Sequence, residues 1–214
     1  MEDLVEMFRD GGPFMWVILV CGLVAAAIAA DRAVFLYGRA AVNAEAFSAT
    51  IQKLVMANNI ERAVKICNAE PNALLPQVIL AGLLHANESE GDIRDAVEEA
   101  AVSLSPKVFR RINHLSMLAN VATLLGLLGT IQGLIAAFDA VGGETGGART
   151  AALADGISVA MFTTFFGLVV AIPSVVVHGL ALSRAEDLAD EIESHALKVT
   201  NLLVARRRGL SHAP

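Results

Sequence analysis

Three long stretches without any charged side chain decide what this chain can fold into. They cover residues 11–30, 114–138 and 156–183. About 20 apolar residues let an α-helix cross the roughly 30 Å hydrocarbon layer of a bilayer. Only helices and closed barrels satisfy their own backbone hydrogen bonds at that depth. We therefore predict an all-α membrane protein with three transmembrane helices and a helical cytoplasmic domain.

The distribution of basic residues predicts how these spans are oriented. Of the 16 Lys and Arg residues, 14 lie between Arg32 and Arg111 or from Arg184 onward. Positive charge remains on the cytoplasmic side, so the N-terminus is expected outside and the C-terminus inside. The expected segments are a periplasmic N-terminal segment (1–13), a first span (14–37), a cytoplasmic helical domain (38–113), a second span (114–138), a periplasmic loop (139–155), a third span (156–183) and a cytoplasmic helical tail (184–214).

Helical periodicity continues outside the spans. Residues 44–57 and 60–69 are predicted to form a helical hairpin, followed by a short apolar helix at 74–85. Asp92 is predicted to cap the next helix. Ser105 and Pro106 have the types expected at an N-cap and a first helical turn, which predicts that the helix entering the second span restarts or kinks there. The tail should present Leu188, Ile192, Leu197 and Val199 on one apolar side, packed on residues 92–111 or on a neighbouring copy.

The second span carries a stripe of small residues. Its members recur at spacings of 3, 4, 3 and 4, which places them on one side of a helix; they are Thr123, Gly126, Thr130, Gly133 and Ala137. Small side chains let another helix come close, and close packing is a main source of association energy in lipid. Two interpretations remain open from this span alone. The stripe is a packing groove with a stray hydroxyl, or the hydroxyl faces a pore or a partner.

The third span repeats the pattern, which favours a shared interior surface. Its stripe contains Gly156, Ala160, Thr163, Gly167, Ala171, Ser174 and His178, with Thr164 at its edge. Because one copy presents two such faces, we expect that it cannot satisfy both alone. The two stripes together therefore predict a ring of several copies.

The chemistry of the spans excludes most functional classes. The sequence has no serine nucleophile elbow, P-loop or zinc-binding helix, so no enzyme, metal site or cofactor is expected. A net charge of −6 disfavours binding to nucleic acid, which is itself negatively charged. Proton or cation transport through a membrane usually needs a buried ionisable group, and no carboxylate lies inside any span. If this chain conducts, the titrating group must come from another chain.

Two sequence segments resemble a known family. LLGLLGTIQGL, followed about 30 residues later by GISVAMFTTFFGLVVAIPSV, is similar to the MotA/TolQ/ExbB proton-channel family, most closely to its three-span ExbB/TolQ branch. The matching residues are Gly126, Leu127, Leu128, Gly129, Thr130 and Gly133 in the second span, and Gly156, Ile157, Thr164, Gly167, Ala171, Ile172 and Pro173 in the third. Looser similarity runs through residues 76–84 and 96–101.

The resemblance implies a homopentamer in the bacterial inner membrane whose second and third spans line a central pore. Two copies of an ExbD/TolR-like single-span protein would sit in this pore and bring an essential aspartate. Proton-motive force would drive a relative movement that is passed to a periplasmic client. The pore threonines of the family correspond to Thr130 and Thr164, and we add Thr163 as a further ion-path candidate. Expected pore-face packing residues are Gly126, Gly129, Gly133, Gly156, Ala160, Gly167, Ala171 and Pro173.

Two departures from the family pattern bear on the process that is energised. ExbB and TolQ usually carry glutamate where this chain has Val159, and proline where it has Thr123. These departures suggest a divergent branch, such as a gliding or other surface-motility motor. A non-conducting scaffold, in which the threonines only pack, is the alternative of another class. A small-molecule transporter would normally need more spans or inverted repeats.

Overall fold

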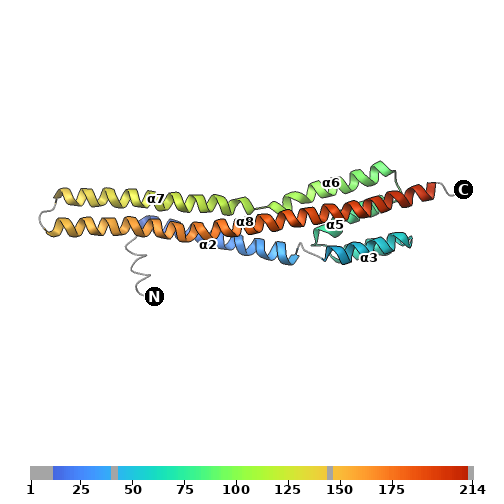
Figure 1. The fold of residues 1–214 in the computed structure, drawn as a ribbon, viewed down its shortest axis with the longest axis horizontal. Coiled ribbons are helices and arrows are strands. Elements are labelled where there is room, and N and C mark those ends of the chain that lie inside the picture. Colours follow the sequence, from blue (N-terminus) through green and yellow to red (C-terminus); the bar gives the residue numbers. More distant parts are fainter. Residues whose placement is uncertain (1–11, 40–42, 144–146, 212–214) are drawn as a thin grey trace. The chain divides into compact units, whose positions relative to one another are not determined.

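The computed structural model describes residues 12–39, 43–143 and 147–211, and its elements are helical throughout these ranges. The elements are α2 (Gly12–Val34), the π-helix η1 (Phe35–Arg39), α3 (Ala44–Met56), α4 (Ile60–Ala69), α5 (Leu74–Leu84), α6 (Glu90–Phe109), α7 (Ile112–Gly143) and α8 (Gly147–Ser211) (Figure 1). No strand occurs in the described residues, which confirms the all-α prediction. The segment expected at residues 1–13 falls almost entirely outside them.

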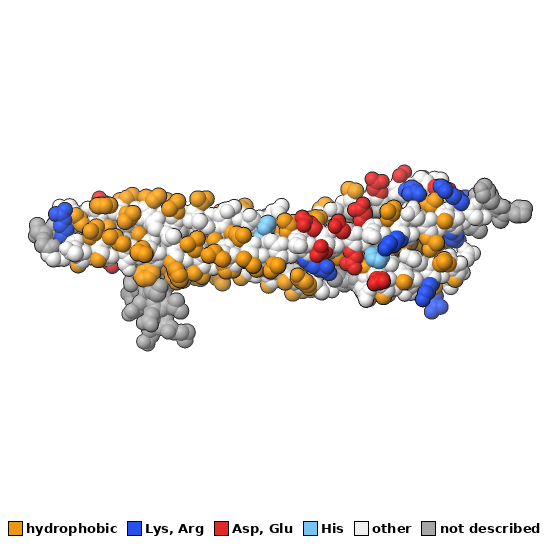
Figure 2. All heavy atoms as spheres, in the orientation of Figure 1, with side chains coloured by type: hydrophobic (Ala, Val, Ile, Leu, Met, Phe, Trp, Pro, Cys, Tyr) orange, Lys and Arg blue, Asp and Glu red, His pale blue; other side chains and the backbone are white. Residues whose placement is uncertain are grey.

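Three of these helices are long and apolar enough to cross a membrane, as expected. They are α2, α7 and the N-terminal part of α8. Large apolar side chains are exposed along all three, including Leu23, Leu124 and Met161. Figure 2 shows hydrophobic side chains gathered over α7 and the first part of α8, whereas charged side chains gather over α6 and the rest of α8. Exposed apolar surface of this kind is what a helix in lipid or against other subunits requires.

The helices belong to two compact units. The first, which we call the membrane unit, contains the described parts of residues 1–31 and 111–180. The second, which we call the helical domain, contains those of residues 32–110 and 181–214. Helix α8 runs through both units.

The predicted boundary between the last two spans is wrong. Residues 139–155 were expected to form a periplasmic loop, but α7 continues to Gly143 and α8 begins at Gly147. The run Ala151-Ala152-Leu153-Ala154 consists of strong helix formers, and no proline interrupts it. The third span and the tail are likewise parts of the single helix α8.

The predicted helix start at Ser105-Pro106 is also wrong. Pro106 lies inside α6, on an exposed position between the buried Leu104 and Val108. The break comes later, at Arg111, whose φ of 64° lies in the left-handed region. A proline removes one backbone donor, and the continued burial of the flanking side chains keeps the helix going past it.

The helical domain confirms the predicted hairpin and short apolar helix. Helices α3 and α4 meet at Asn58, which adopts a φ of 60°, a conformation that asparagine tolerates better than most residues. Helix α5 has buried residues on most of its surface. The cap of α6 differs from the prediction, because Ser89 is the N-cap. Its hydroxyl accepts from the Asp92 N–H at 3.2 Å, and the Asp92 carboxylate accepts from the Ser89 N–H at 3.0 Å.

The end of α8 packs within its own chain. Leu188, Ile192 and Val199 are buried as expected, whereas Leu197 is 53% exposed. The Ser48 hydroxyl and His195 Nδ1 lie 2.7 Å apart. Arg208 donates two hydrogen bonds to the Glu90 carboxylate, at 2.6 and 2.7 Å, and this bonding holds the pKa of Glu90 below its usual value. The C-terminal helix is thereby connected to α3 and α6.

Burial in the helical domain should make Cys67 chemically inert. Burial raises the pKa of the Cys67 thiol from 9.0 to about 12, and only the thiolate reacts with maleimide. At pH 8 the native protein should therefore label at Cys67 far more slowly than protein unfolded in SDS, as measured by intact mass. The matched control is Met56→Cys, at a position that is 71% exposed in the same domain, which should label rapidly without SDS. Equal rates at the two positions would contradict the buried placement of Cys67.

Candidate functional site

Helices α7 and α8 approach each other along a line of small residues that we call the seam. It is formed by Ala122, Gly126, Gly129, Gly133 and Ala137 of α7 and by Gly156, Ala160, Thr163, Gly167 and Ala171 of α8. All ten residues are buried. Ala119, Ala122 and Ala171 form a small buried cluster within the same unit. The membrane unit therefore obtains its close packing from an absence of side-chain bulk.

The glycines of the seam leave no room for a methyl group. A Cβ atom on Gly167 would lie 2.8 Å from the carbonyl oxygen of Ala122, and one on Gly133 would lie 2.9 Å from the backbone nitrogen of Ala160. A Cβ atom on Gly156 would overlap Ala137. Because the neighbours are largely backbone atoms, they cannot rotate away. The two helix backbones are thus in direct contact.

The seam overturns one step of the sequence argument. We expected that one copy could not satisfy two small-residue stripes, but the stripes of α7 and α8 satisfy each other within one chain. The packing residues expected from the sequence lie in the seam, with the exception of Pro173. The stripes by themselves therefore give no reason for a ring.

Thr163 lies inside the seam and not on an open face. Its side chain is 1% exposed and presses against Gly129, where an added Cβ atom would lie 2.6 Å from it. Its hydroxyl donates to carbonyl oxygens of its own helix, Ala160 at 2.9 Å and Val159 at 3.3 Å. This hydroxyl is used locally, as is common for threonine in helices. The arrangement does not suit the ion-path role expected for Thr163.

Thr130 and Thr164 lie at the edge of the seam and are both half-buried. The Thr164 hydroxyl donates across the seam to the carbonyl oxygen of Gly126 at 3.2 Å. In an α-helix the same carbonyl accepts the backbone N–H of Thr130, so the two threonines converge on Gly126. The Thr130 hydroxyl donates to Leu127 in its own helix. Each hydroxyl oxygen retains acceptor capacity, which can serve water or a protonated acid.

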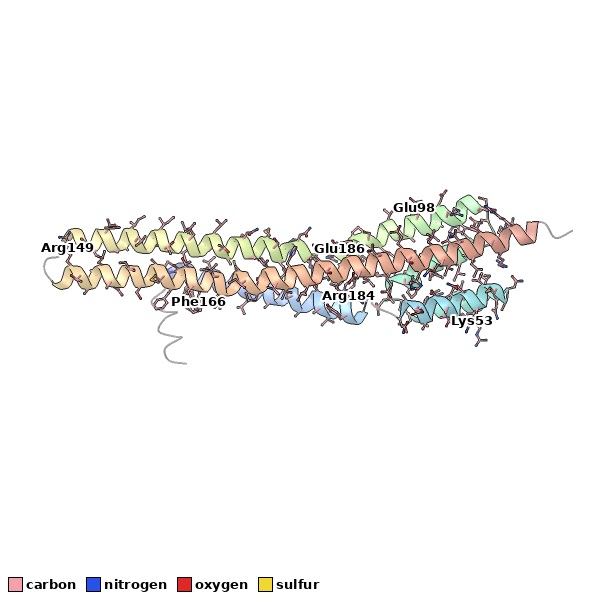
Figure 3. The ribbon with its side chains drawn as sticks, in the orientation of Figure 1. Lys53, Glu98, Arg149, Phe166, Arg184 and Glu186 are labelled. Carbon is pink, nitrogen blue, oxygen red and sulfur yellow. The ribbon has the colours of Figure 1, made fainter. Side chains whose placement is uncertain are left out.

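Pro173 and Val159 have other surroundings. Pro173 is exposed and lines an apolar groove of about 400 Å³ together with Ala25 of α2 and Leu115 of α7. It therefore faces α2 and lies outside the seam, a correction to its expected place. Val159 is half-buried and brings no charge. Phe166, labelled in Figure 3, lies on the side of α8 away from α7, and its ring meets that of Phe165 edge to face at 5.7 Å.

Sequence reasoning missed Ala122 of the seam and Ala119, which is buried beside it. The expected stripe was centred on Thr123 and Thr130, whereas the structure centres it roughly one residue earlier. Ala122 precedes Gly126 by four residues and Ala119 precedes Ala122 by three, so the helical spacing could have found both. The expected stripe included Thr123 and Thr130 because they are the polar residues beside the glycines.

The site can form hydrogen bonds, but its own side chains cannot titrate. No cluster of three or more His, Cys, Asp or Glu residues suitable for a metal occurs in the described ranges. The three uncharged stretches contain no acid or basic side chain other than His114 and His178. The fold and the seam define a class, namely a three-span helical membrane subunit with two threonine hydroxyls at the edge of a close helix contact.

Comparison with known proteins identifies the family. Residues 70–194 match the family model described as the MotA/TolQ/ExbB proton channel family, and the chain belongs to this family. It is 28% identical over 209 residues to the biopolymer transport protein exbB1 of Vibrio cholerae, covering 94% of this chain and 89% of that one. A putative ExbB homolog of Methanothermobacter thermautotrophicus is 27% identical, with 89% of this chain and 67% of the relative covered. An ExbB-like protein of Synechocystis is 29% identical, with coverages of 87% and 74%.

Family membership settles the general function. The chain is an inner-membrane protein and a proton-channel subunit of an ExbB/TolQ-type system. The family is one of channel and transport complexes and not one of enzymes. The assignment agrees with three helices that are long and apolar enough to cross a membrane.

Adding one methyl group to the seam should destabilise the membrane unit. In Gly167→Ala the new Cβ atom meets backbone atoms of Ala122 and Gly126, so α7 and α8 must separate. Forced overpacking of this kind costs about 1–3 kcal/mol. The midpoint of thermal unfolding in detergent should fall accordingly.

Gly179→Ala is the matched control in the same helix, because a Cβ atom there meets nothing within 4 Å. Alanine has a higher helix propensity than glycine, so this variant should be neutral or slightly more stable. Equal stabilities of the two variants would show that the backbones of α7 and α8 are not in contact.

Proposed function

We propose that this chain is the ring-forming subunit of a motor driven by proton-motive force. Five copies would surround a dimer of an ExbD/TolR-like single-span protein in the inner membrane. The complex would energise a periplasmic or outer-membrane process through a periplasmic client, as the biopolymer transport names of its relatives suggest. The support comes from the family, the three spans and the chemistry of the seam edge.

One observation carries this proposal. Two half-buried threonines lie at the edge of the seam, where the Thr164 hydroxyl donates to the carbonyl of Gly126 and the Thr130 hydroxyl donates to the carbonyl of Leu127. The uncharged spans contain no carboxylate that could bind and release a proton. A proton carrier supplied by another chain would therefore find its hydrogen-bond partners at Thr130 and Thr164.

The hydroxyl pair suits an acid that changes its protonation state. A hydroxyl accepts a hydrogen bond from a protonated carboxyl group and donates one to a carboxylate after rotating. Burial alone raises the pKa of a carboxyl group, and hydrogen bonds to its charged form lower it again. Threonines at this position would thus let the partner's acid titrate within the membrane. Neither hydroxyl itself needs to lose a proton.

The internal seam leaves other surfaces for assembly. Because α7 and α8 bury their small residues against each other, contacts between copies must use their remaining faces. These faces carry exposed apolar residues such as Leu128, Ile135 and Phe165. Their surface is suited to lipid and to neighbouring spans alike, so a ring is compatible with the fold of one copy.

Replacing the two seam-edge threonines should separate assembly from activity. Valine has nearly the shape of threonine but no hydroxyl, and a neutral hydrogen bond contributes only about 1 kcal/mol to stability. Thr130→Val and Thr164→Val should therefore assemble as the unmodified chain does in native mass spectrometry. Proton flux of the reconstituted complex should be nearly abolished, because every copy carries the lesion. Thr130→Ser and Thr164→Ser should keep part of the flux.

Thr163→Val is the matched control for this series. Its hydroxyl is buried and bonded within its own helix, so its loss should leave proton flux unchanged. Should Thr130→Val and Thr164→Val conduct normally, the threonines are packing residues and the non-conducting scaffold is the better interpretation.

The proposed orientation has its own test. Fusions of green fluorescent protein after Gly91 and after Arg208 should fluoresce, because both positions are expected in the cytoplasm. Alkaline phosphatase inserted between Gly143 and Gly147 should be active, because this connection is expected in the periplasm. Phosphatase activity from a fusion after Gly91 would reverse the proposed orientation.

A further inference from the structure

A second face of α7 combines polarity with exposure. Four polar side chains occur in residues 115–131, namely Ser116, Asn120, Thr123 and Thr130. At 100° per residue they fall within an arc of about 80°. The other positions of this stretch hold only Leu, Met, Ala, Val, Ile and Gly. We call these four residues the polar face of α7.

The polar face is distinct from the seam. Its centre lies about 100° around the helix from the positions of Ala122, Gly126 and Gly133. The structure agrees, because Asn120 and Thr123 are exposed, and Ser116 and Thr130 half-buried, whereas the seam residues are buried. Thr130 stands where the polar face meets the seam edge. Between Ser116 and Thr130 the only other side chain in this arc is Leu127, which is 55% exposed, so the polar face runs along α7 to Thr130 past one apolar side chain.

The polar groups of this face are not consumed within the chain. The Thr123 hydroxyl donates to the carbonyl of Ala119 at 3.0 Å, which leaves its oxygen free to accept. Within the part of the chain that the structure describes, the Asn120 carboxamide has no hydrogen-bond partner. An unsatisfied amide in hydrocarbon costs several kcal/mol. The polar face therefore requires water or another polar surface beside it.

The polarity stops at Thr130. Beyond it the same arc carries Leu134 and Phe138, which are 42% and 67% exposed. Toward the start of α7 the exposed Asn113 lies about 20° outside this arc. If this surface only packed against another helix, nothing would require its polar residues to end at Thr130. A path for water that ends at Thr130 does require this.

We propose that the polar face of α7 carries a file of water that connects the threonine pair to the Ile112 end of the helix. In the proposed orientation this end is the cytoplasmic one, so the file is the exit half of the proton path. A proton released at the level of Thr130 would pass along the hydrogen-bonded water, and a proton would leave at the far end. This inference rests on the proposed function for its role, but the presence of water can be tested separately.

Cysteine accessibility tests the water directly. The parent is Cys21→Ala, in which Cys67 is expected to stay unreactive, and the complete complex is labelled in inside-out membrane vesicles with a charged methanethiosulfonate. Thiols need water to ionise, and each unit of pKa increase in lipid lowers the thiolate fraction tenfold. Asn120→Cys and Thr123→Cys should therefore react at least about tenfold faster than Val121→Cys and Leu128→Cys, which lie on other faces of α7. Leu134→Cys, on the same arc beyond Thr130, should react as slowly as these controls.

Proton flux through the reconstituted complex tests the role. The double variant Asn120→Leu/Thr123→Val should lower the flux severalfold, whereas Gln132→Leu should not, because Gln132 is exposed on the opposite side of α7. Equal labelling at all positions overturns the inference, and labelling that is equally slow everywhere shows a dry contact between chains. Undiminished flux in the double variant overturns it as well. Fast labelling of the polar face in a complex that conducts no protons would support the water file while rejecting the proposed function.

Discussion

The direct contact between the backbones of α7 and α8 is the constraint on which the membrane unit depends. Glycine at positions 126, 133, 156 and 167 removes the side chains that normally hold helices apart, and an added Cβ atom at any of them would lie 2.8–3.1 Å from a backbone atom of the facing helix. In lipid, where apolar side chains gain little from burial, this closeness supplies the dispersion energy of association. It also brings the Thr164 hydroxyl within 3.2 Å of the Gly126 carbonyl.

The same contact makes the faces of α7 differ in their surroundings. One face is occupied by α8, and another, with Asn120 and Thr123, stays exposed. Thr130 lies between them, at the edge of the rigid contact. A hydroxyl in this place has a fixed position and an open side, and the proposed function needs both to guide a proton carrier from another chain. Thr130 thus belongs both to the edge of the close contact and to the polar face of α7.

The cost of charge in a membrane explains why, in the proposed complex, the titrating group and its hydrogen-bond partners belong to different chains. An ionised side chain is costly in the bilayer interior, and the spans of this chain contain no carboxylate. The chain offers neutral hydroxyls and an amide, which stabilise a charge or water without carrying charge themselves. Its charged residues are concentrated in the helical domain, where Glu90 and Arg208 form a bidentate pair.

The sequence by itself determined the three spans, their apolar character and the helical hairpin around Asn58, and it marked Thr130 and Thr164 as candidate ion-path residues. These are local properties, because span length and helical periodicity depend only on neighbouring residues. Only the tertiary structure decided which surfaces meet. Periodicity assigns an angle around one helix, but it does not say which helix occupies that side. For this reason the sequence could not tell that the two stripes face each other, that Thr163 is enclosed while Thr164 stays at the edge, or that Pro173 faces α2.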